Sequence, residues 1–425
     1  MNKREETMIK LYSLGGSGEN GRNCYAIEWS EGAILLDCGV KREINENGIG
    51  DYPVLTKELV SKLKFVLLSH AHEDHSASLP LIYNMGYKGK VYASRPTANS
   101  TPNFMNKWKN FVKENNGVTP FSDEDIKKVE FEILNIGLNT IDGIEITVGR
   151  SGHVLGGIWF IINVEGKKIF YSGDIVSEPM LLNNDKPSEV DAAILNCAYA
   201  GKILKQSEQY KILLNSIKDT LSAGGKVILP LPPNGRGCDI YKFLCENIKD
   251  IKLYVDKEII DNYNKLLTMN EWIKDIDNNI SPENVVCIST MEEREIVCLK
   301  DEAAVLLTQD GMLTAVQGKY YFEHLKEDER NKVIITGHAA KGTLGAEIFN
   351  EEYCKNNSIK LQKGHVIFKV HFDDVDVVEF NKYLKAKTII LFHSNKEKTV
   401  NVISKLNNNG VNAMCLTPGE SYNFE

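Results

Sequence analysis

A dense group of metal-ligand side chains follows a short apolar run near residue 70. Residues 65–68 have the composition of a buried strand, and the chain continues Ser-His-Ala-His-Glu-Asp-His over residues 69–75. In extended chain, residues two apart point to the same side, so His70, His72 and Asp74 are expected to project together, with His75 as a fourth donor. Three imidazoles and a carboxylate within six residues suit a borderline metal such as zinc. The segment predicts a metal site rather than a polar loop that happens to be rich in histidine.

Further polar side chains stand at the ends of other apolar strands. Asp37 closes the strand 33–36, His153 lies between glycines, and Asp174 follows a hairpin formed by residues 159–171. His371 and His393 each follow an apolar run, at residues 366–370 and 388–392. Asp37 could cap a loop or orient a metal-bound histidine, and Asp174 is able to bridge two cations. These strand ends supply the donors that the first cluster still needs.

The composition indicates the class of protein and its surroundings. A chain of 425 residues with 42% apolar and 25% charged residues is typical of a globular protein of two or three domains. The net charge of −8 argues against broad polyanion binding but leaves room for a local basic groove. Nine scattered cysteines without a Cys-x-x-Cys pair indicate reduced thiols and a cytoplasmic location. No apolar run approaches the length of about 18 residues that a membrane span needs, so no membrane partner is expected.

Two other segments indicate how the chain is organised. The sequence Gly-Gly-Ser-Gly at residues 15–18 lacks the lysine of a phosphate-binding loop, so a turn-rich connection between strands is expected. From about residue 201, helical and strand patterns alternate, beginning with a serine-capped helix over 207–221. This alternation predicts a separate α/β domain with a mostly parallel sheet.

Taken together, these motifs resemble those of the metallo-β-lactamase-fold nucleases of the β-CASP group, which process RNA, over nearly the whole chain. The matching segments are Leu-Leu-Asp-Cys-Gly at 35–39, His-Ala-His-Glu-Asp-His at 70–75, Gly-His-Val-Leu-Gly at 152–156, Tyr-Ser-Gly-Asp at 171–174, Gly-Arg at 235–236, Gly-Met-Leu at 311–313, Thr-Gly-His at 336–338, Gly-Thr-Leu-Gly at 342–345, His371 with Asp373, and Leu-Phe-His at 391–393. The resemblance implies an α/β protein: an αββα sandwich in two parts, 1–200 and 351–425, interrupted by a β-CASP domain at 201–350.

The resemblance also implies roles for individual residues. One of two zinc ions would be held by His70, His72 and His153, the other by Asp74, His75 and His393, with Asp174 bridging both and Asp37 orienting a histidine. His371 would act as the acid that protonates the leaving oxygen, and Asp74 would be essential for catalysis as a ligand. Arg236 and Lys341 are candidates for phosphate contacts in a cleft between the domains, and the alternative for each is a solvated surface charge.

One position departs from the group's pattern. The group carries an acidic residue where this chain has Asn196, and that acid is expected to hold the catalytic histidine in its charged form. An amide oxygen can accept the same hydrogen bond but brings no charge. Asn196 is therefore expected to lie within hydrogen-bond reach of His371 and to leave it a weaker acid-base group.

The function implied is that of a zinc-dependent ribonuclease acting on single-stranded RNA through a hydroxide activated by two metals. His393 favours RNA over DNA, because the DNA-processing branch of the group tends to carry valine there. Two alternatives stay open: a hydrolase of another substrate, DNA or a small ester, and a weakly catalytic RNA-binding subunit. The sequence leaves open endo- against exonucleolytic action and the formation of a homo-oligomer.

Overall fold

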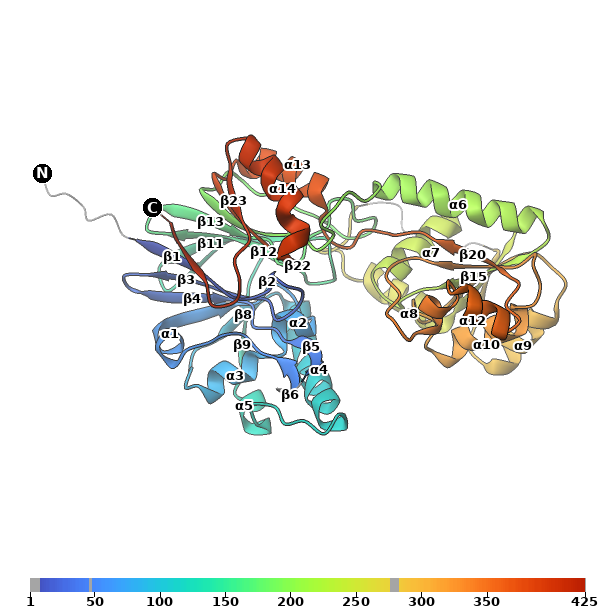
Figure 1. The fold of residues 1–425 in the computed structure, drawn as a ribbon, viewed down its shortest axis with the longest axis horizontal. Helices are drawn as coiled ribbons and strands as arrows, with labels where there is room; N and C mark the ends of the chain where they lie inside the picture. The colour runs from blue at the N-terminus through green and yellow to red at the C-terminus, as the bar shows by residue number, and fades with distance from the viewer. Residues whose placement is uncertain (1–7, 46–47, 276–282, 425) are drawn as a thin grey trace, which may run out of the picture. The chain divides into compact units, whose positions relative to one another are not determined.

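The chain folds into two compact units, seen in a computed structural model that describes residues 8–45, 48–275 and 283–424 (Figure 1). Unit 1 comprises the described parts of residues 1–179, 183–202 and 371–425, and unit 2 comprises 180–182 and 203–370. The chain returns to unit 1 at residue 371 rather than at the expected 351. The reason is that β20 (Gln362–His365) still pairs, in parallel, with β19 (Lys332–Ile335) of unit 2.

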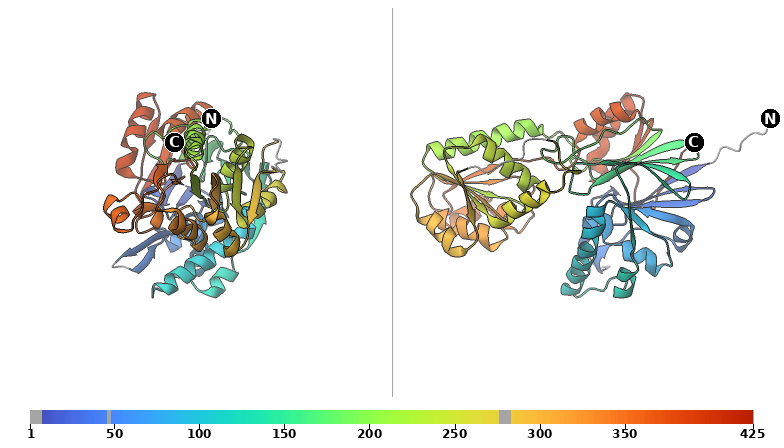
Figure 2. Two further views of the ribbon diagram at one scale, coloured as in Figure 1. Left: turned by 90° about the vertical axis from the view of Figure 1, so that its right-hand side faces the viewer. Right: turned by 180° about the vertical axis from the view of Figure 1, so that it is seen from behind.

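Over the described residues, unit 1 contains two seven-stranded sheets packed face to face between outer helices, as two opposite views show (Figure 1 and Figure 2). The first sheet has the order β24 (Ser421–Phe424), β1 (Ile9–Gly15), β3 (Cys24–Trp29), β4 (Gly32–Leu36), β7 (Leu63–Leu67), β8 (Val91–Ala93) and β9 (Phe131–Ile133). The second has the order β10 (Gly137–Ile141), β11 (Ile144–Arg150), β12 (Ile158–Val164), β13 (Lys167–Tyr171), β14 (Ala192–Asn196), β21 (Thr388–Phe392) and β23 (Asn412–Met414). This is the αββα sandwich predicted from the sequence.

Alternation of side chains in the strands fills three apolar layers of unit 1. The outer face of the first sheet packs on α1 (Lys57–Lys62), α3 (Leu79–Asn84), α4 (Arg95–Glu114) and α5 (Asp123–Lys127). The outer face of the second packs on α13 (Asp374–Leu384) and α14 (Lys396–Asn408). Between the sheets, the Tyr25 ring lies 5.7 Å from that of Tyr171 and 5.3 Å from that of Phe392. Such tilted aromatic contacts join the two sheets beneath the polar strand ends.

Unit 2 is the α/β domain that the alternating pattern predicted. Its described residues form a six-stranded parallel sheet in the order β17 (Val285–Ile288), β16 (Lys252–Asp256), β18 (Ala304–Thr308), β15 (Lys226–Pro230), β19 and β20. Its helices are α6 (Gln206–Ser222), α7 (Arg236–Asn247), α8 (Lys257–Leu267), α9 (Met291–Leu299), α10 (Val316–Leu325), α11 (Leu344–Glu347) and α12 (Glu351–Asn356). Figure 1 shows α6 and α7 on one face of this sheet and α9, α10 and α12 on the other.

The remaining short elements lie in unit 1. They are α2 (Glu73–Ser76) and the strand pairs β2 (Ser17–Gly18) with β22 (Ser394–Asn395) and β5 (Lys41–Asn45) with β6 (Gly48–Asp51). None of the helices in the described part of the chain combines the length and apolarity that a membrane span requires.

Candidate metal centre

Parallel strand pairing gathers the predicted donors at one edge of unit 1. In the first sheet, β4 and β7 run parallel and lead to Asp37 and His70. In the second sheet, β13, β14 and β21 run parallel and lead to Asp174, Asn196 and His393. Because the carboxyl ends of parallel strands meet at one edge of a sheet, residues far apart in sequence come together there.

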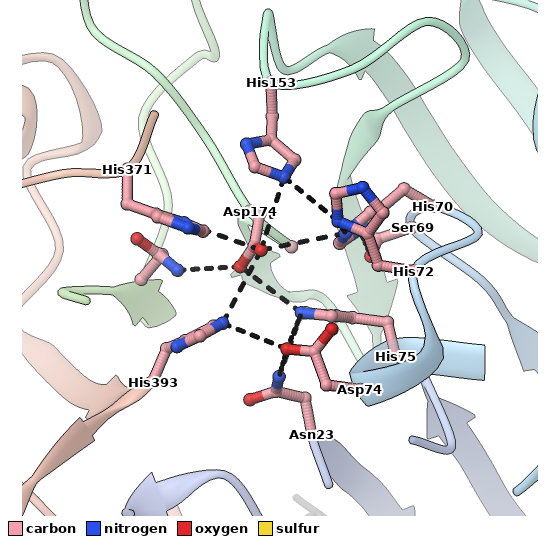
Figure 3. Close-up of polar contacts among 12 residues, drawn as sticks. Asn23, Ser69, His70, His72, Asp74, His75, His153, Asp174, His371 and His393 are labelled. Atoms are coloured by element: carbon pink, nitrogen blue, oxygen red, sulfur yellow. Dashed lines mark hydrogen bonds and ion pairs between the residues drawn. The ribbon is translucent and has the colours of Figure 1, made fainter. Parts of the chain in front are cut away.

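The donor atoms form two groups that share Asp174. One group consists of His70, His72, His153 and Asp174, and the other of Asp74, His75, His393 and Asp174; within each group the ligand atoms lie within 4.8 Å of one another. Figure 3 shows Asp174 at the centre, with imidazoles pointing toward it from several directions. The ring centroids of His75 and His393 are 5.9 Å apart. The structure therefore brings His153, Asp174 and His393 together with the His70 cluster, and their binding of metal stays a prediction.

The spacing within each group matches what a tetrahedral ion requires. A zinc ion bound at about 2.0–2.1 Å separates its tetrahedral ligands by about 3.3 Å. In the first group, His72 Nδ1 lies 3.1 Å from His70 Nε2 and 3.3 Å from His153 Nε2. In the second group, His393 Nε2 lies 3.1 Å from Asp74 Oδ2, and His75 Nε2 lies 3.3 Å from Asp174 Oδ1. Nitrogen and carboxylate oxygen donors at this spacing fit two divalent ions of the zinc class.

The local backbone differs from the extended chain expected after residue 70. Residues 73–76 form the helical turn α2, which begins after His72. Asp74 and His75 consequently turn away from His70 and His72 and supply the second donor group instead of the first. The turn packs so closely on the loop after β4 that a Cβ at Gly39 would collide with the carbonyl of Asp74. Glycine at position 39 is thus required by the approach of the two backbones.

Asp37 contacts a histidine of the second donor group, His75. Its Oδ2 accepts hydrogen bonds from His75 Nδ1 at 2.7 Å, Tyr171 Oη at 2.6 Å and Ser69 Oγ at 2.6 Å, and its Oδ1 accepts from Ser69 N at 2.7 Å. With Nδ1 held by this carboxylate, His75 presents Nε2 to the second donor group. Asp37 and His393 both have left-handed backbone conformations, with φ of 57° and 66°. Such conformations are uncommon for residues other than glycine and collect at functional sites.

Burial and charge divide the histidines into two kinds. Burial lowers the pKa of His70 and His72, so these imidazoles are neutral and keep a lone pair for a metal. At His75 the effect of burial is outweighed by the carboxylates of Asp174 and Asp74, which raise its pKa. The same attraction, acting against burial, holds the pKa of Asp174 well below its usual value. The carboxyl groups of Asp174 and Asp74 therefore stay ionised, as a site for cations requires.

The expected hydrogen bond between Asn196 and His371 is not found among the contacts of these two residues. Asn196 Nδ2 donates instead to Asp174 Oδ1 at 2.8 Å, and its Oδ1 accepts from the backbone N of Phe372 at 3.4 Å. His371 Nδ1 lies 3.5 Å from Asp174 Oδ2 and is buried without a hydrogen-bond partner among the described residues. The amide is closest to the shared carboxylate because β13 and β14 are paired neighbours.

Two features of the centre escaped the sequence analysis. Asn23 is fully buried, and its Nδ2 lies 2.9 Å from His75 Nε2 and 3.2 Å from Asp74 Oδ2. The glycine-rich connection beginning at residue 15 is a turn, as expected, but Gly16 O also accepts a hydrogen bond from His393 N at 2.7 Å. The crowding of four glycines around Asn23 was the available signal, because backbone packed this closely often borders a site.

Arg236 and Lys341 both belong to unit 2. Arg236 is the first residue of α7, and a Cβ at Gly337 would collide with its guanidinium, while one at Gly311 would lie 3.5 Å from Nη2. Lys341 is exposed and precedes Gly342. The packing of Arg236 explains why glycines stand in two of the motifs of this unit, and phosphate contact by either residue remains a prediction.

The two-sheet sandwich and its paired donor groups define the fold of a metallo-β-lactamase, and comparison with known proteins agrees. The metallo-beta-lactamase superfamily matches residues 17–220, and the Beta-Casp domain matches residues 239–348. The chain therefore contains a metallo-beta-lactamase domain with an inserted Beta-Casp domain. Membership of this superfamily implies binding of divalent metal.

Similar proteins cover nearly the whole chain. An RNase J-like protein of Methanocaldococcus jannaschii is 28% identical, over 92% of this chain and 94% of that protein. Transcription termination factor FttA of Methanococcus maripaludis is 25% identical, over 94% of this chain and 69% of that protein. Endoribonuclease YSH1 of Yarrowia lipolytica is 27% identical, and the chain spans 50% of its length. A crystal structure of a protein of unknown function from Enterococcus faecalis superposes with a TM-score of 0.63 at 12% identity, over 98% of this chain and 100% of that one, which shows the fold alone.

Proposed function

We propose that this chain is a metal-dependent ribonuclease that hydrolyses phosphodiester bonds of single-stranded RNA at a centre of two zinc ions. The observation that carries the proposal is the pair of donor groups with tetrahedral spacing around the shared Asp174. The RNase J-like and endoribonuclease relatives, which match over nine-tenths of the chain, support RNA as the substrate. A cytoplasmic location is proposed with it.

Each residue of the centre has a distinct task in this proposal. His70, His72 and His153 would hold one ion and Asp74, His75 and His393 the other, with Asp174 shared by both groups. Bound ions of this class activate water and neutralise charge on a phosphate. Asp37 fixes the direction of the His75 ring through the 2.7 Å bond to Nδ1. These seven ligands come from four loops at strand ends and one helical turn, so the rigid sheets hold the reacting geometry.

His371 is the proton donor in the proposal. Its ring centroid lies 4.9 Å from those of His153 and His393, so it borders both donor groups. Burial lowers its pKa well below the usual value, although Asp174 acts in the opposite direction. A neutral ring supplies a proton less readily at neutral pH, and general acid catalysis of this kind contributes about 10²–10⁴-fold. Turnover limited by the leaving group is therefore expected at neutral pH.

Arg236 and Lys341 are proposed to contact RNA phosphates from unit 2. The guanidinium of Arg236 is held against Gly337, and a fixed fork of donors suits a phosphate. Replacing either residue with glutamine should weaken RNA binding and reduce its dependence on salt.

The test is a cleavage assay with zinc-loaded protein on end-labelled single-stranded RNA, single-stranded DNA, a generic phosphodiester and a small thioester. Wild type should cleave RNA, while Asp74→Ala and His153→Ala should lose both activity and bound zinc. His324→Ala changes an exposed histidine of unit 2 and is the matched control that should keep both. Binding of RNA without cleavage would identify a binding subunit, and cleavage of DNA or the thioester alone would identify a different hydrolase. Either result would overturn the proposal.

A further inference from the structure

Helix α4 borders the metal centre and is anchored to it at its first turn. The hydroxyls of Ser94 and Thr97 both donate to the carbonyl of Gly156, at 2.6 and 2.9 Å, and so hold the loop that carries His153. Met105 and Trp108 are buried beneath the helix. The hydrogen bonds at the first turn and the burial of Met105 and Trp108 together fix the position of the exposed side of α4 relative to the donor groups.

An aromatic ring and a lysine stand on this helix beside the donors. Phe104 is half-buried, and its ring centroid lies 5.8 Å from that of His72 with the planes at 67°. Lys107 follows one helical turn later, is exposed, and places Nζ 5.5 Å from the centre of the Phe104 ring. A half-buried phenyl ring next to a metal ligand offers a flat apolar surface beside the donor groups.

The charge of α4 is opposite to that of the whole chain. The helix contains Arg95, Lys107, Lys109 and Lys113 against the single acid Glu114, in a protein of net charge −8. Lys109 is paired with Asp123. Among the described residues, the contact of the Lys107 ammonium group is with the Phe104 ring. Its flexible stem allows Nζ to move to a phosphate. Local positive charge combined with an aromatic surface is how single-stranded nucleic acid is held without regard to sequence.

We propose that Phe104 and Lys107 form a nucleotide subsite in unit 1, in which Phe104 stacks on the base next to the scissile phosphate and Lys107 contacts the adjoining phosphate. This inference rests on the proposed ribonuclease function and adds the group that selects single-stranded substrate. A base can stack on the ring only when it is unpaired and turned outward, so duplex RNA is excluded at this position. The subsite belongs to unit 1 alone and requires no particular placement of unit 2.

The experiment is an abasic scan read by kcat and KM. The zinc-loaded enzyme is given a set of single-stranded RNAs, each lacking one base, and the intact RNA. For wild type, removal of one base beside the cleaved bond should lower kcat/KM about 5- to 100-fold relative to the intact RNA, mainly through a higher KM. Phe104→Leu should lose a similar factor on intact RNA and become insensitive to the missing base at that position. Lys107→Gln should lose a few-fold and show a salt dependence reduced by about one charge.

Matched variants separate stacking from packing. Phe111→Leu removes another half-buried ring of α4, which Arg42 covers at 4.1 Å, and Lys113→Gln removes a charge of the same helix; both should behave as wild type. Phe104→Tyr keeps the ring and should restore sensitivity to the missing base, and zinc content reports whether any variant has disturbed His72. If wild type cleaves RNA but Phe104→Leu keeps the abasic effect, or if Phe104→Tyr behaves like leucine, the subsite is refuted while the ribonuclease stands. If wild type cleaves no RNA, the function and the subsite fall together.

Discussion

Asp37→Asn is the substitution that tests most directly how the centre is held. The carboxylate accepts four hydrogen bonds, three at Oδ2 and one at Oδ1, and is fully buried. An amide of the same shape has only one acceptor atom. Its better orientation keeps the oxygen toward His75 and Tyr171 and turns the NH2 group toward the backbone N–H of Ser69. Two donors then face each other next to His70.

The cost follows from these contacts. A buried donor left without an acceptor costs about 1–3 kcal/mol. The three remaining hydrogen bonds change from a charged to a neutral acceptor, and each loses about 1 kcal/mol. Together the free energy of unfolding of the metal-free protein should fall by about 4–6 kcal/mol, a large part of typical domain stability. Because His75 Nδ1 then donates to a neutral oxygen instead of a carboxylate, its Nε2 is a weaker ligand, and zinc affinity of the second donor group should fall about 10- to 100-fold.

Two measurements check this prediction. Urea unfolding of chelator-treated protein gives the change in stability, and competition with a chromophoric chelator gives the affinity of each zinc ion. Tyr171→Phe is the matched control, since it removes one donor from Asp37 and should cost only about 1 kcal/mol with zinc affinity nearly unchanged. If Asp37→Asn unfolds at the wild-type urea concentration and binds two zinc ions as tightly as wild type, Asp37 does not hold the centre in this way.

Three further predictions concern single side chains. Asn23→Ala removes the amide at 3.2 Å from Asp74 Oδ2 and should lower zinc affinity of the second donor group about tenfold, seen by the same chelator competition, with the first group unchanged. Asn196→Asp puts a carboxylate where Nδ2 now donates to Asp174, so the metal-free protein should lose about 1–3 kcal/mol in urea unfolding and gain more stability from zinc than wild type does. Burial raises the pKa of Asp239 to about 6, above about 3.9 in unfolded chain, so wild-type stability is lost as pH rises through this window. Asp239→Asn can still accept a hydrogen bond from Leu181 N, so the free energy of unfolding of this variant should rise relative to that of wild type by about 1 kcal/mol between about pH 5 and pH 7. If the difference in stability between variant and wild type is the same at both pH values, the titration of Asp239 is excluded.

The ligands could be predicted from sequence because they obey a simple rule of sheet geometry. Each apolar run that ends in Asp37, His70, Asp174 or His393 is a buried strand that runs parallel to at least one neighbour, and the carboxyl ends of such paired strands share one edge. The order of the strands was not needed for this inference. The separate α/β unit was predictable for the same reason, since its alternating helices and strands allow little besides a parallel sheet.

What the sequence could not supply depends on contacts between elements. The helical turn at residues 73–76 is too short for periodicity to reveal, so only the family resemblance, and not the strand pattern, assigned Asp74 and His75 to the second donor group. The return of the chain at residue 371 depends on the pairing of β20 with β19, which is a long-range choice. Asn23 belongs to no sequence motif, so its contacts with Asp74 and His75 could be found only in the structure.

Asn196 shows how one substitution can move a hydrogen bond without removing the centre. A carboxylate at this position can only accept, so beside the ionised Asp174 it would be drawn toward a donor such as His371. An amide can donate as well, and here its Nδ2 turns to Asp174 while its Oδ1 accepts from the backbone next to His371. The carboxylate shared by both donor groups thereby gains a fixed direction, and the His371 ring loses a charged partner. The exchange favours a well-ordered metal centre over a strong proton donor. All seven ligand side chains remain in place beside this amide, so slow turnover at neutral pH would not require decay of the site.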